Sequence, residues 1–296
     1  MSAVIEYFTH ISTMDRAILI VGGFALLWML ESAFGASRYA RVLHARTNLV
    51  FWISSLVINL CVSGLTLGAS FTVTREKFGI LNLVELPLWL NVVLSIALLD
   101  FVAAYVHHRM VHAVPVLWKF HLVHHSDPHV DSTTALRHSP VEAVIRSGFT
   151  LGGVIVLGVS PGVLVAYQAV ALWSAQWIHS DIHLPRAVDS LLSRVWVSPG
   201  MHRVHHHKAL PYTDTNYGTI FSVWDRLFGT FRTLDTDEVV FGIDSIPESA
   251  DREQSAVRLM RLALLPASEG YRARAQITHG RTVPAQPRHH ELRHLP

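Results

Sequence analysis

The sequence predicts an all-α, polytopic membrane protein with about three transmembrane helices, a helical hairpin and a histidine-rich cap. Half of the 296 residues are apolar and only 16% are charged, whereas roughly a quarter of the residues are charged in a soluble domain. Long apolar runs without Lys or Arg recur along the first two thirds of the chain. Histidine is the compositional outlier, with 20 copies, of which 14 fall between His107 and His207.

Three apolar runs are long enough to span a bilayer, for which a helix needs about 20 residues. They extend from Ala17 to Phe34, from Leu49 to Phe71 and from Pro87 to Tyr105. A buried soluble core is the alternative, but such long uncharged runs are rare in soluble folds. A cleaved signal peptide is a second alternative for the first run. Glu6 and Asp15 argue against it, because they stand where a positive segment is expected.

A fourth apolar region, Val144 to Ile178, is interrupted by the sequence Gly158-Val159-Ser160-Pro161-Gly162. Proline and glycine together break helices, and each flanking half is long enough for a short span. We therefore expect a helical hairpin that enters and leaves the membrane on one side.

The short loops predict the orientation, because Lys and Arg concentrate in cytoplasmic loops. One side carries Arg38, Arg41 and Arg46 after the first span, and Arg109, Lys119 and Arg137 after the third. The other side carries only Arg16, Arg75 and Lys77, the last two beside Glu76. We expect the chain to begin outside, with the histidine cap and the C-terminus in the cytoplasm.

The chain divides into one membrane-embedded domain, residues 1–233, and a polar tail, residues 234–296, which we expect to be flexible. Tail histidines His289, His290 and His294 are expected to be solvated. The formal charge of +2 and the lack of a long basic run with interleaved aromatics exclude a nucleic-acid partner. Cys61 is the only cysteine, so an intrachain disulfide is excluded.

Four histidine elements have helical spacing, which places residues three or four apart on one face. A pair at i, i+4 or a triplet at i, i+3, i+4 can converge on one metal ion. One pair would be a weak signal, but four elements offer ten ligands at predicted membrane boundaries, enough for two ions. They are His108 and His112; His121, His124 and His125; His179 and His183; and His202, His205 and His206.

Imidazole ligands suit Fe, Zn, Cu or Ni rather than Mg or Ca, so the residues alone leave the metal open. A zinc hydrolase would carry a His-Glu-x-x-His helix, and the chain has none. Haem usually needs only one or two axial histidines inside a bundle, whereas these histidines cluster at predicted helix ends.

The motifs around the histidines are distinctive. They are Asp100-Phe101, His108-Arg109-x-x-His112, Leu117-Trp118-Lys119-Phe120-His121-x-x-His124-His125-Ser126, Leu136-Arg137-His138-Ser139-Pro140-x-Glu142, Ser198-Pro199-x-Met201-His202-Arg203-x-His205-His206, Asn216-Tyr217-Gly218 and Trp224-Asp225-x-x-Phe228-Gly229-Thr230. With these motifs, residues 100–230 resemble the fatty acid hydroxylase and sterol desaturase superfamily.

The resemblance implies a non-haem centre of two iron ions that activates O₂ to hydroxylate or desaturate a lipid, in a helical membrane fold with a cytoplasmic cap. Zinc could replace iron in a purified protein. Electrons are expected from an external donor, either cytochrome b5-like or a ferredoxin with its reductase. The His-Pro-Gly-Gly signature of a fused cytochrome b5 domain is absent from the sequence.

Two further residues are candidates for catalysis. Asp100 precedes His108 by eight residues, hence on the same helical stripe, and is the best candidate to orient a ligand or relay a proton. Asn216 is a candidate to hold a metal-bound water. His138 and Glu142 could brace the cap, but His138 ranks behind the ten ligands.

The remaining polar residues are interpreted as ordinary. His107 and His207 adjoin ligands but point elsewhere on a helix, and Glu31 in the first span is expected to make a helix-end or inter-helix contact. The histidines without a partner at useful spacing are His10, His44 and His129.

Hydroxylation of a lipid C–H bond is the leading functional prediction, with desaturation by the same centre as the alternative. A histidine-rich metal transporter would place His, Asp or Glu along the spans, which are nearly free of them. A membrane electron carrier with bis-histidine haem is a third class. The lipid itself stays open among sterols, fatty acyl chains, sphingolipids, ether lipids and carotenoids.

Overall fold

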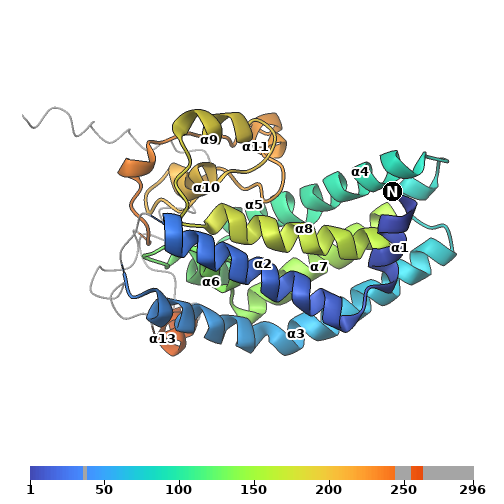
Figure 1. The fold of residues 1–296 in the computed structure, drawn as a ribbon, viewed down its shortest axis with the longest axis horizontal. Coiled ribbons are helices and arrows are strands. Elements are labelled where there is room, and N and C mark those ends of the chain that lie inside the picture. Colours follow the sequence, from blue (N-terminus) through green and yellow to red (C-terminus); the bar gives the residue numbers. More distant parts are fainter. Residues whose placement is uncertain (36–38, 244–254, 263–296) are drawn as a thin grey trace, which may run out of the picture.

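The computed structural model describes residues 1–35, 39–243 and 255–262, which form helices joined by loops (Figure 1). Within these ranges the only β-type pairs are two isolated bridges, Gly35 with Ile182 and Trp196 with Phe221. The prediction of an all-α fold is therefore confirmed.

The three predicted spans correspond to long helices, and each extends beyond the predicted apolar run. They are α2 (Thr13–Phe34), α3 (Arg41–Arg75), and α4 (Leu88–Leu99), which continues through a π-helical segment (Asp100–Val106) into α5 (His107–Ala113). In the described part of the chain these helices and α7 (Pro140–Leu157) are long and apolar enough to cross a membrane. A short helix, α1 (Ser2–His10), precedes them and packs on α8 (Pro161–His179).

The predicted hairpin is formed by α7 and α8. Gly158 ends α7 with a φ of 77°, a left-handed conformation that glycine adopts without strain. Pro161 then occupies the first turn of α8, where its missing N–H costs nothing. The first seven residues of α8 are buried, and this helix packs against α1, α2, α3 and α4. It is therefore the central helix of the bundle.

A cap of short segments lies at one end of the bundle, with α9, α10 and α11 grouped beside α5 (Figure 1). Ser198 and Pro199 begin α10: the Ser198 hydroxyl accepts from Met201 N at 3.2 Å and Pro199 stands in the first turn. The cap segments are α6 (Pro115–His125), η3 (Ser132–Leu136), α9 (Arg186–Leu192), α10 (Pro199–His205), η4 (Tyr212–Asp214), α11 (Val223–Leu227) and η5 (Thr236–Glu238).

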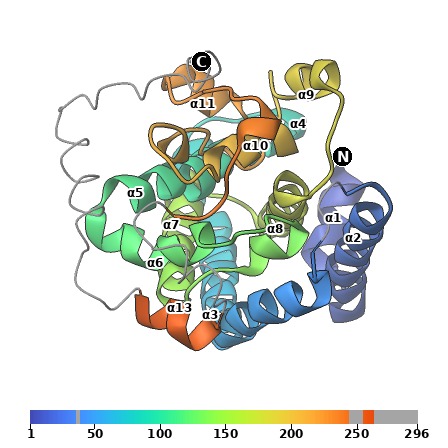
Figure 2. The same ribbon diagram turned by 90° about the vertical axis from the view of Figure 1, so that its left-hand side faces the viewer.

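The described part of the C-terminal region contains one helix that the sequence analysis does not predict, α13 (Ala256–Leu262), below α6 in Figure 2. Its Leu259 is buried against Phe51 of α3 and Val123 of α6. Seven residues with one buried leucine give too short an apolar period to detect. His289, His290 and His294, and the rest of the predicted tail after residue 262, lie outside the described residues.

Candidate metal centre

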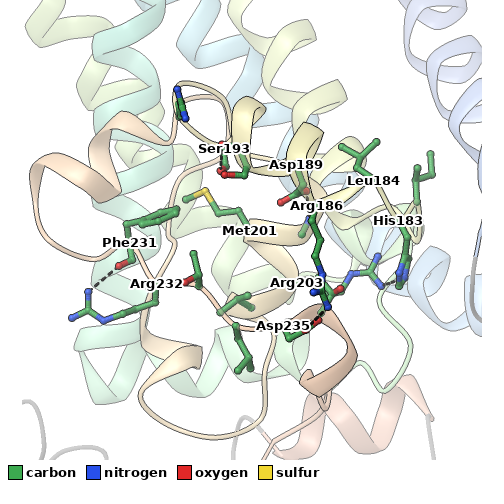
Figure 3. A pocket seen from close by; sticks show the side chains of 18 of the residues that line it. His183, Leu184, Arg186, Asp189, Ser193, Met201, Arg203, Phe231, Arg232 and Asp235 are labelled. Carbon is green, nitrogen blue, oxygen red and sulfur yellow. Dashed lines mark hydrogen bonds and ion pairs between the residues drawn. The ribbon is translucent and has the colours of Figure 1, made fainter.

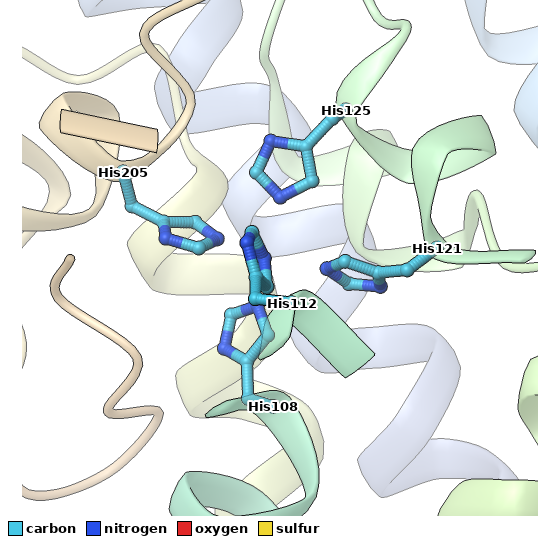
Figure 4. Close-up of side chains that lie close together, drawn as sticks. All are labelled: His108, His112, His121, His125 and His205. Carbon is cyan, nitrogen blue, oxygen red and sulfur yellow. The ribbon is translucent and has the colours of Figure 1, made fainter. Parts of the chain in front are cut away.

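Nine of the ten predicted ligands come together in two groups of buried imidazoles, each with ring nitrogens within 4.8 Å of one another. We call them the five-histidine cluster and the four-histidine cluster. The first contains His108, His112, His121, His125 and His205 (Figure 4). The second contains His124, His179, His202 and His206.

The five-histidine cluster has a regular pattern of outward contacts through Nδ1. His108 bonds to the Tyr217 carbonyl at 2.9 Å and His205 to the Thr215 carbonyl at 2.7 Å. His112 bonds to Asp214 at 3.0 Å and His121 to Glu142 at 2.7 Å. A carbonyl or carboxylate on Nδ1 fixes the tautomer that leaves the Nε2 lone pair available for a metal.

The opposite nitrogens point into the cluster. Nε2 of His108, His121 and His205, and both ring nitrogens of His125, are buried without a hydrogen-bond partner among the described residues. Unpartnered buried nitrogen is costly in a protein interior. A metal ion at this position would remove that cost, so the donor set fits one.

The four-histidine cluster gathers around His179, whose Nδ1 bonds to the Ala175 carbonyl at 2.6 Å. Its Nε2 then carries the lone pair, and it lies 3.1 Å from Nε2 of His124 and 3.0 Å from Nε2 of His202. Both ring nitrogens of His206 are buried without a partner among the described residues. Nitrogens facing one another at this distance are also arranged to share one cation.

The two clusters adjoin each other. The rings of His125 and His206, one from each cluster, stack with centroids 4.7 Å apart, and those of His121 and His124 lie 5.1 Å apart. The geometry therefore supports a two-metal centre rather than two separate sites.

Each histidine triplet is divided between the clusters, although the spacing rule allows a triplet to converge on one ion. The i, i+4 pair His121 and His125 joins one cluster and His124 the other, and the pair His202 and His206 is likewise separated from His205. Consecutive helical residues diverge by about 100°, so adjacent histidines cannot face one point. This division links the clusters through α6 and α10.

His183 is not brought to either cluster, although it was predicted to pair with His179. Helix α8 ends at His179, and Ser180 is extended, with a ψ of 146°, so the helical i, i+4 relation is lost. The His183 ring lies beside Arg203, with Nη1 to Nε2 at 2.6 Å, and 3.5 Å from Asp181.

The two predicted catalytic residues bond to backbone groups and to an indole instead of the imidazoles. Asp100 accepts from the Trp224 indole at 2.9 Å and from two backbone amides, Ile220 and Phe221, at 3.2 Å. Asp100 and His108 do lie on one face of the span, because both contact the segment 217–224. No hydrogen bond joins Asp100 to a histidine of either cluster. The role of Asp100 is to attach the cap to the third span.

Asn216 has a left-handed backbone, with a φ of 55°. Its side-chain amide donates to the carbonyls of Met201 at 3.0 Å and Arg232 at 2.8 Å, and its oxygen accepts from the Arg232 amide at 2.9 Å. The side chain is therefore engaged in fixing α10 against the following loop.

Glu142 braces the site as the sequence suggested. One carboxylate oxygen accepts from Nδ1 of His121 at 2.7 Å and of His138 at 2.8 Å, and the His138 ring stacks on His124 with centroids 4.6 Å apart. Through these contacts Glu142 and His138 reach both clusters.

Five of the clustered histidines are held neutral. Burial lowers the pKa of His124, His125, His202, His205 and His206 well below the usual value, and neighbouring imidazoles lower it further. Neutral imidazole is the form that binds metals.

Sequence reasoning missed a buried polar network beside the clusters, because its residues are far apart in the chain. His44, interpreted as ordinary, lies 2.6 Å from Asp127 and 3.2 Å from Asp131. Arg137 is fully buried and donates to the Val123 carbonyl at 2.9 Å and to Asn48 at 3.0 Å. Burial favours a raised pKa for Asp127, but Arg137 and His44 outweigh it and hold that pKa well below its usual range.

Glu31 makes the inter-element contact that was expected of it. Its carboxylate accepts from the Ser132 amide at 2.8 Å and hydroxyl at 2.6 Å, the Asp181 amide at 2.8 Å and Arg41 at 2.7 Å. It thus holds the loop after the second histidine element and the segment after α8 against the first span.

Comparison with known proteins agrees with this geometry. The family model described as fatty acid hydroxylase matches residues 92–230, a range that contains all nine clustered histidines. This region, slightly less than half of the chain, is similar to the fatty acid hydroxylase family. No solved structure is similar enough to count as a match.

Three curated relatives illustrate the family. The chain is 31% identical over 141 residues to human alkylglycerol monooxygenase, a stretch covering 47% of this chain and 30% of that protein. It is 28% identical over 145 residues to ornithine lipid hydroxylase OlsE of Rhizobium tropici, covering 49% and 43%. It is 29% identical over 150 residues to human cholesterol 25-hydroxylase, covering 50% and 54%. The match thus spans between 30% and 54% of these relatives' length.

The buried network predicts that replacing Arg137 strongly lowers the stability of the fold. Replacing it with Met removes one of the two cationic groups that offset the buried charge of Asp127, the other being His44, and takes away the donor to the Asn48 oxygen, so we expect a loss of about 3–5 kcal/mol of stability. The exposed Arg75→Met is the control, because its pairing with Glu76 lies at the surface and contributes at most about 1 kcal/mol. Thermal unfolding in detergent measures both, and equal midpoints for the two variants would contradict the assignment.

Proposed function

We propose that this protein hydroxylates a C–H bond of a lipid, using O₂ and two iron ions held by the two histidine clusters. The observation that carries the proposal is the pair of adjoining, buried, all-imidazole clusters at the cap end of a bundle of membrane-length helices. The three relatives support it, because their names describe monooxygenases or hydroxylases of lipids.

The two ions would be held by the nine clustered histidines. Bound there, they would supply the redox chemistry that activates O₂. The chain's own residues would orient the ligands: Glu142 and Asp214 hold His121 and His112 by their Nδ1 atoms, and the loop carbonyls of Thr215 and Tyr217 hold His205 and His108. Burial of every clustered histidine keeps bulk water away from the centre.

An external electron donor is part of the proposal. Hydroxylation places one oxygen atom of O₂ in the product and reduces the other to water, which consumes two electrons and two protons. We propose a cytochrome b5-like protein, or a ferredoxin with its reductase, as the source.

Desaturation by the same centre is the alternative chemistry. The lipid hydroxylases named among the relatives favour hydroxylation. Their names specify three different lipids, an alkylglycerol, an ornithine lipid and cholesterol, so they support a lipid as the class of substrate and not one member of it. Metal transport is disfavoured because the helices that carry most of the clustered histidines, α5, α6 and α10, lie at one end of the bundle (Figure 1), so these histidines do not line a path across it.

The reaction is tested with purified, iron-loaded protein, a reductase system and ¹⁸O₂, with lipids extracted from cells that lack the protein. We expect a lipid product that is heavier by one ¹⁸O atom, dependent on both O₂ and the donor. A product that has lost two hydrogens and gained no label would establish the desaturase instead, and formation without O₂ or donor would overturn both.

The ligand assignment predicts a contrast between histidines. Single Ala replacements of His108, His124, His179 or His205 should lower the bound metal below two ions per chain and abolish turnover, because each removes a bond from the shared centre. His183→Ala and His129→Ala should retain both ions and activity within about twofold, roughly 0.4 kcal/mol in barrier height. Metal analysis and turnover measure this, and full metal content in His124→Ala would refute the assignment.

We also propose that the cap and the C-terminus face the cytoplasm, on the basis of the Lys and Arg distribution. With Cys61 replaced by Ser, we expect Glu76→Cys to be labelled by an impermeant thiol reagent added to intact cells. Asp237→Cys, in the cap, should be labelled only after the cells are opened. External labelling of Asp237→Cys would reverse the topology.

A further inference from the structure

A second polar feature lies beside the clusters, on another face of α10. A half-open cavity of about 700 Å³ lies between α9, α10 and the segment 226–236 (Figure 3). Met201 and Arg203 of α10 line it, whereas His202, His205 and His206 of the same helix belong to the clusters. The cavity is therefore separate from the candidate metal centre.

The lining of this cavity carries an excess of positive charge. Arg186 pairs with Asp235, and Arg203 pairs with Asp181 at 3.3 Å, but the other lining arginines have no carboxylate within ion-pair distance among the described residues. The carboxylate of Asp189, which also lines the cavity, accepts from the Gly200 amide at 3.0 Å. The arginines that line the cavity without a paired carboxylate are Arg194, Arg226 and Arg232.

Such an arrangement suits a phosphate group. Arginine binds phosphate oxygens through two parallel N–H donors, and it is preferred wherever phosphate is recognised by geometry. Arg226 is already positioned, because it lies 3.9 Å from the centre of the Phe231 ring and donates to the Ser193 carbonyl at 2.8 Å.

An exposed apolar surface adjoins the cavity. Two backbone hydrogen bonds join the segment after α9 to the start of α11. Ser222 N donates to the Val195 carbonyl at 2.9 Å, and Val197 N donates to the Ile220 carbonyl at 3.0 Å. We call the apolar side chains exposed on these segments the cap patch. They are Val188, Leu191, Val195, Trp196, Val223, Leu227 and Phe228.

The cap patch lies next to a membrane-spanning helix. The Phe228 ring stacks on Phe101 and Tyr105, with centroids 5.5 Å and 5.4 Å away. Both partners belong to the span Leu88–Ala113. The apolar run of this span ends at Tyr105, just before α5 begins at His107. A tryptophan and large aliphatic side chains beside arginines, near such a boundary, are typical of a surface that rests in the headgroup region of a bilayer.

We propose that the arginine cavity binds the phosphate headgroup of an anionic phospholipid of the surrounding membrane, while the lipid's acyl chains lie against the cap patch. Charge complementarity supplies the headgroup contacts, and the exposed leucines and aromatics supply the apolar ones. An acidic protein would meet the arginines equally well, but it would not explain large apolar side chains exposed beside a span. The proposal does not depend on the reaction.

The test compares lipid retention by the full chain, purified in an uncharged detergent, using native mass spectrometry. The probes are dioleoyl phosphatidylglycerol, dioleoyl phosphatidylcholine and inorganic phosphate. Arg194→Gln/Arg232→Gln removes two cavity charges whose side chains make few contacts. Arg75→Gln/Lys77→Gln removes two exposed charges from the other end of the bundle and is the matched control.

We expect the wild-type chain and the control to retain phosphatidylglycerol in preference to phosphatidylcholine. The cavity variant should retain phosphatidylglycerol roughly tenfold to thirtyfold more weakly, with an unchanged metal content and melting temperature that show it is folded. Arg194→Lys/Arg232→Lys, which keeps the charge, should stay within about threefold of the wild type.

Three results would overturn the proposal. The cavity variant could retain phosphatidylglycerol as well as the control does. Inorganic phosphate could bind as tightly as phosphatidylglycerol, which would indicate a site for a free anion. Finally, the variant could keep its lipid and lose only binding to an acidic electron donor, which would indicate a protein-docking surface.

Discussion

Burying an imidazole nitrogen without a hydrogen-bond partner costs free energy, and this protein buries several of them side by side. Mutual hydrogen bonding among neutral rings cannot satisfy them all, because several rings donate through Nδ1 to a carbonyl or carboxylate and so present only acceptor nitrogens to one another. Cations bound in the two clusters would be coordinated by these nitrogens and would remove this free-energy cost. Much of the surrounding structure can then be understood as the means of holding nine rings in place until metal arrives.

The holding contacts come from a loop and from the ends of two helices. Thr215 and Tyr217 supply carbonyls from a loop, Ala175 supplies one from the last turn of α8, and Glu142 reaches back from the first turn of α7. Such loops are easily displaced unless they are tied down. Buried Asp100 ties the loop 217–224 to the third span, and fully buried Arg137 braces the end of α6.

The features that could be predicted from the sequence are those that depend on local spacing. The spans, the break at Gly158 to Gly162 and the gathering of nine histidines follow from apolar run length and helical periodicity. His183 was misplaced because the rule assumes an unbroken helix, and α8 ends at His179. The bonds of Asp100 and Asn216, and the pairing of His44 with Asp127, join residues distant in sequence, so no local pattern could reveal them.

The third span combines a local irregularity of the helix with contacts to a segment that is distant in the sequence. A π-helical segment, Asp100–Val106, precedes the ligand-bearing α5, and π-helical turns are frequent at functional sites because they re-aim the following side chains. Asp100 and His108, eight residues apart, both contact the loop 217–224, the former through three donors and the latter through the Tyr217 carbonyl. The inference that they share a face was therefore sound. Two attachments along one face fix the rotation of the helix, and that rotation aims His108 and His112 at the cluster.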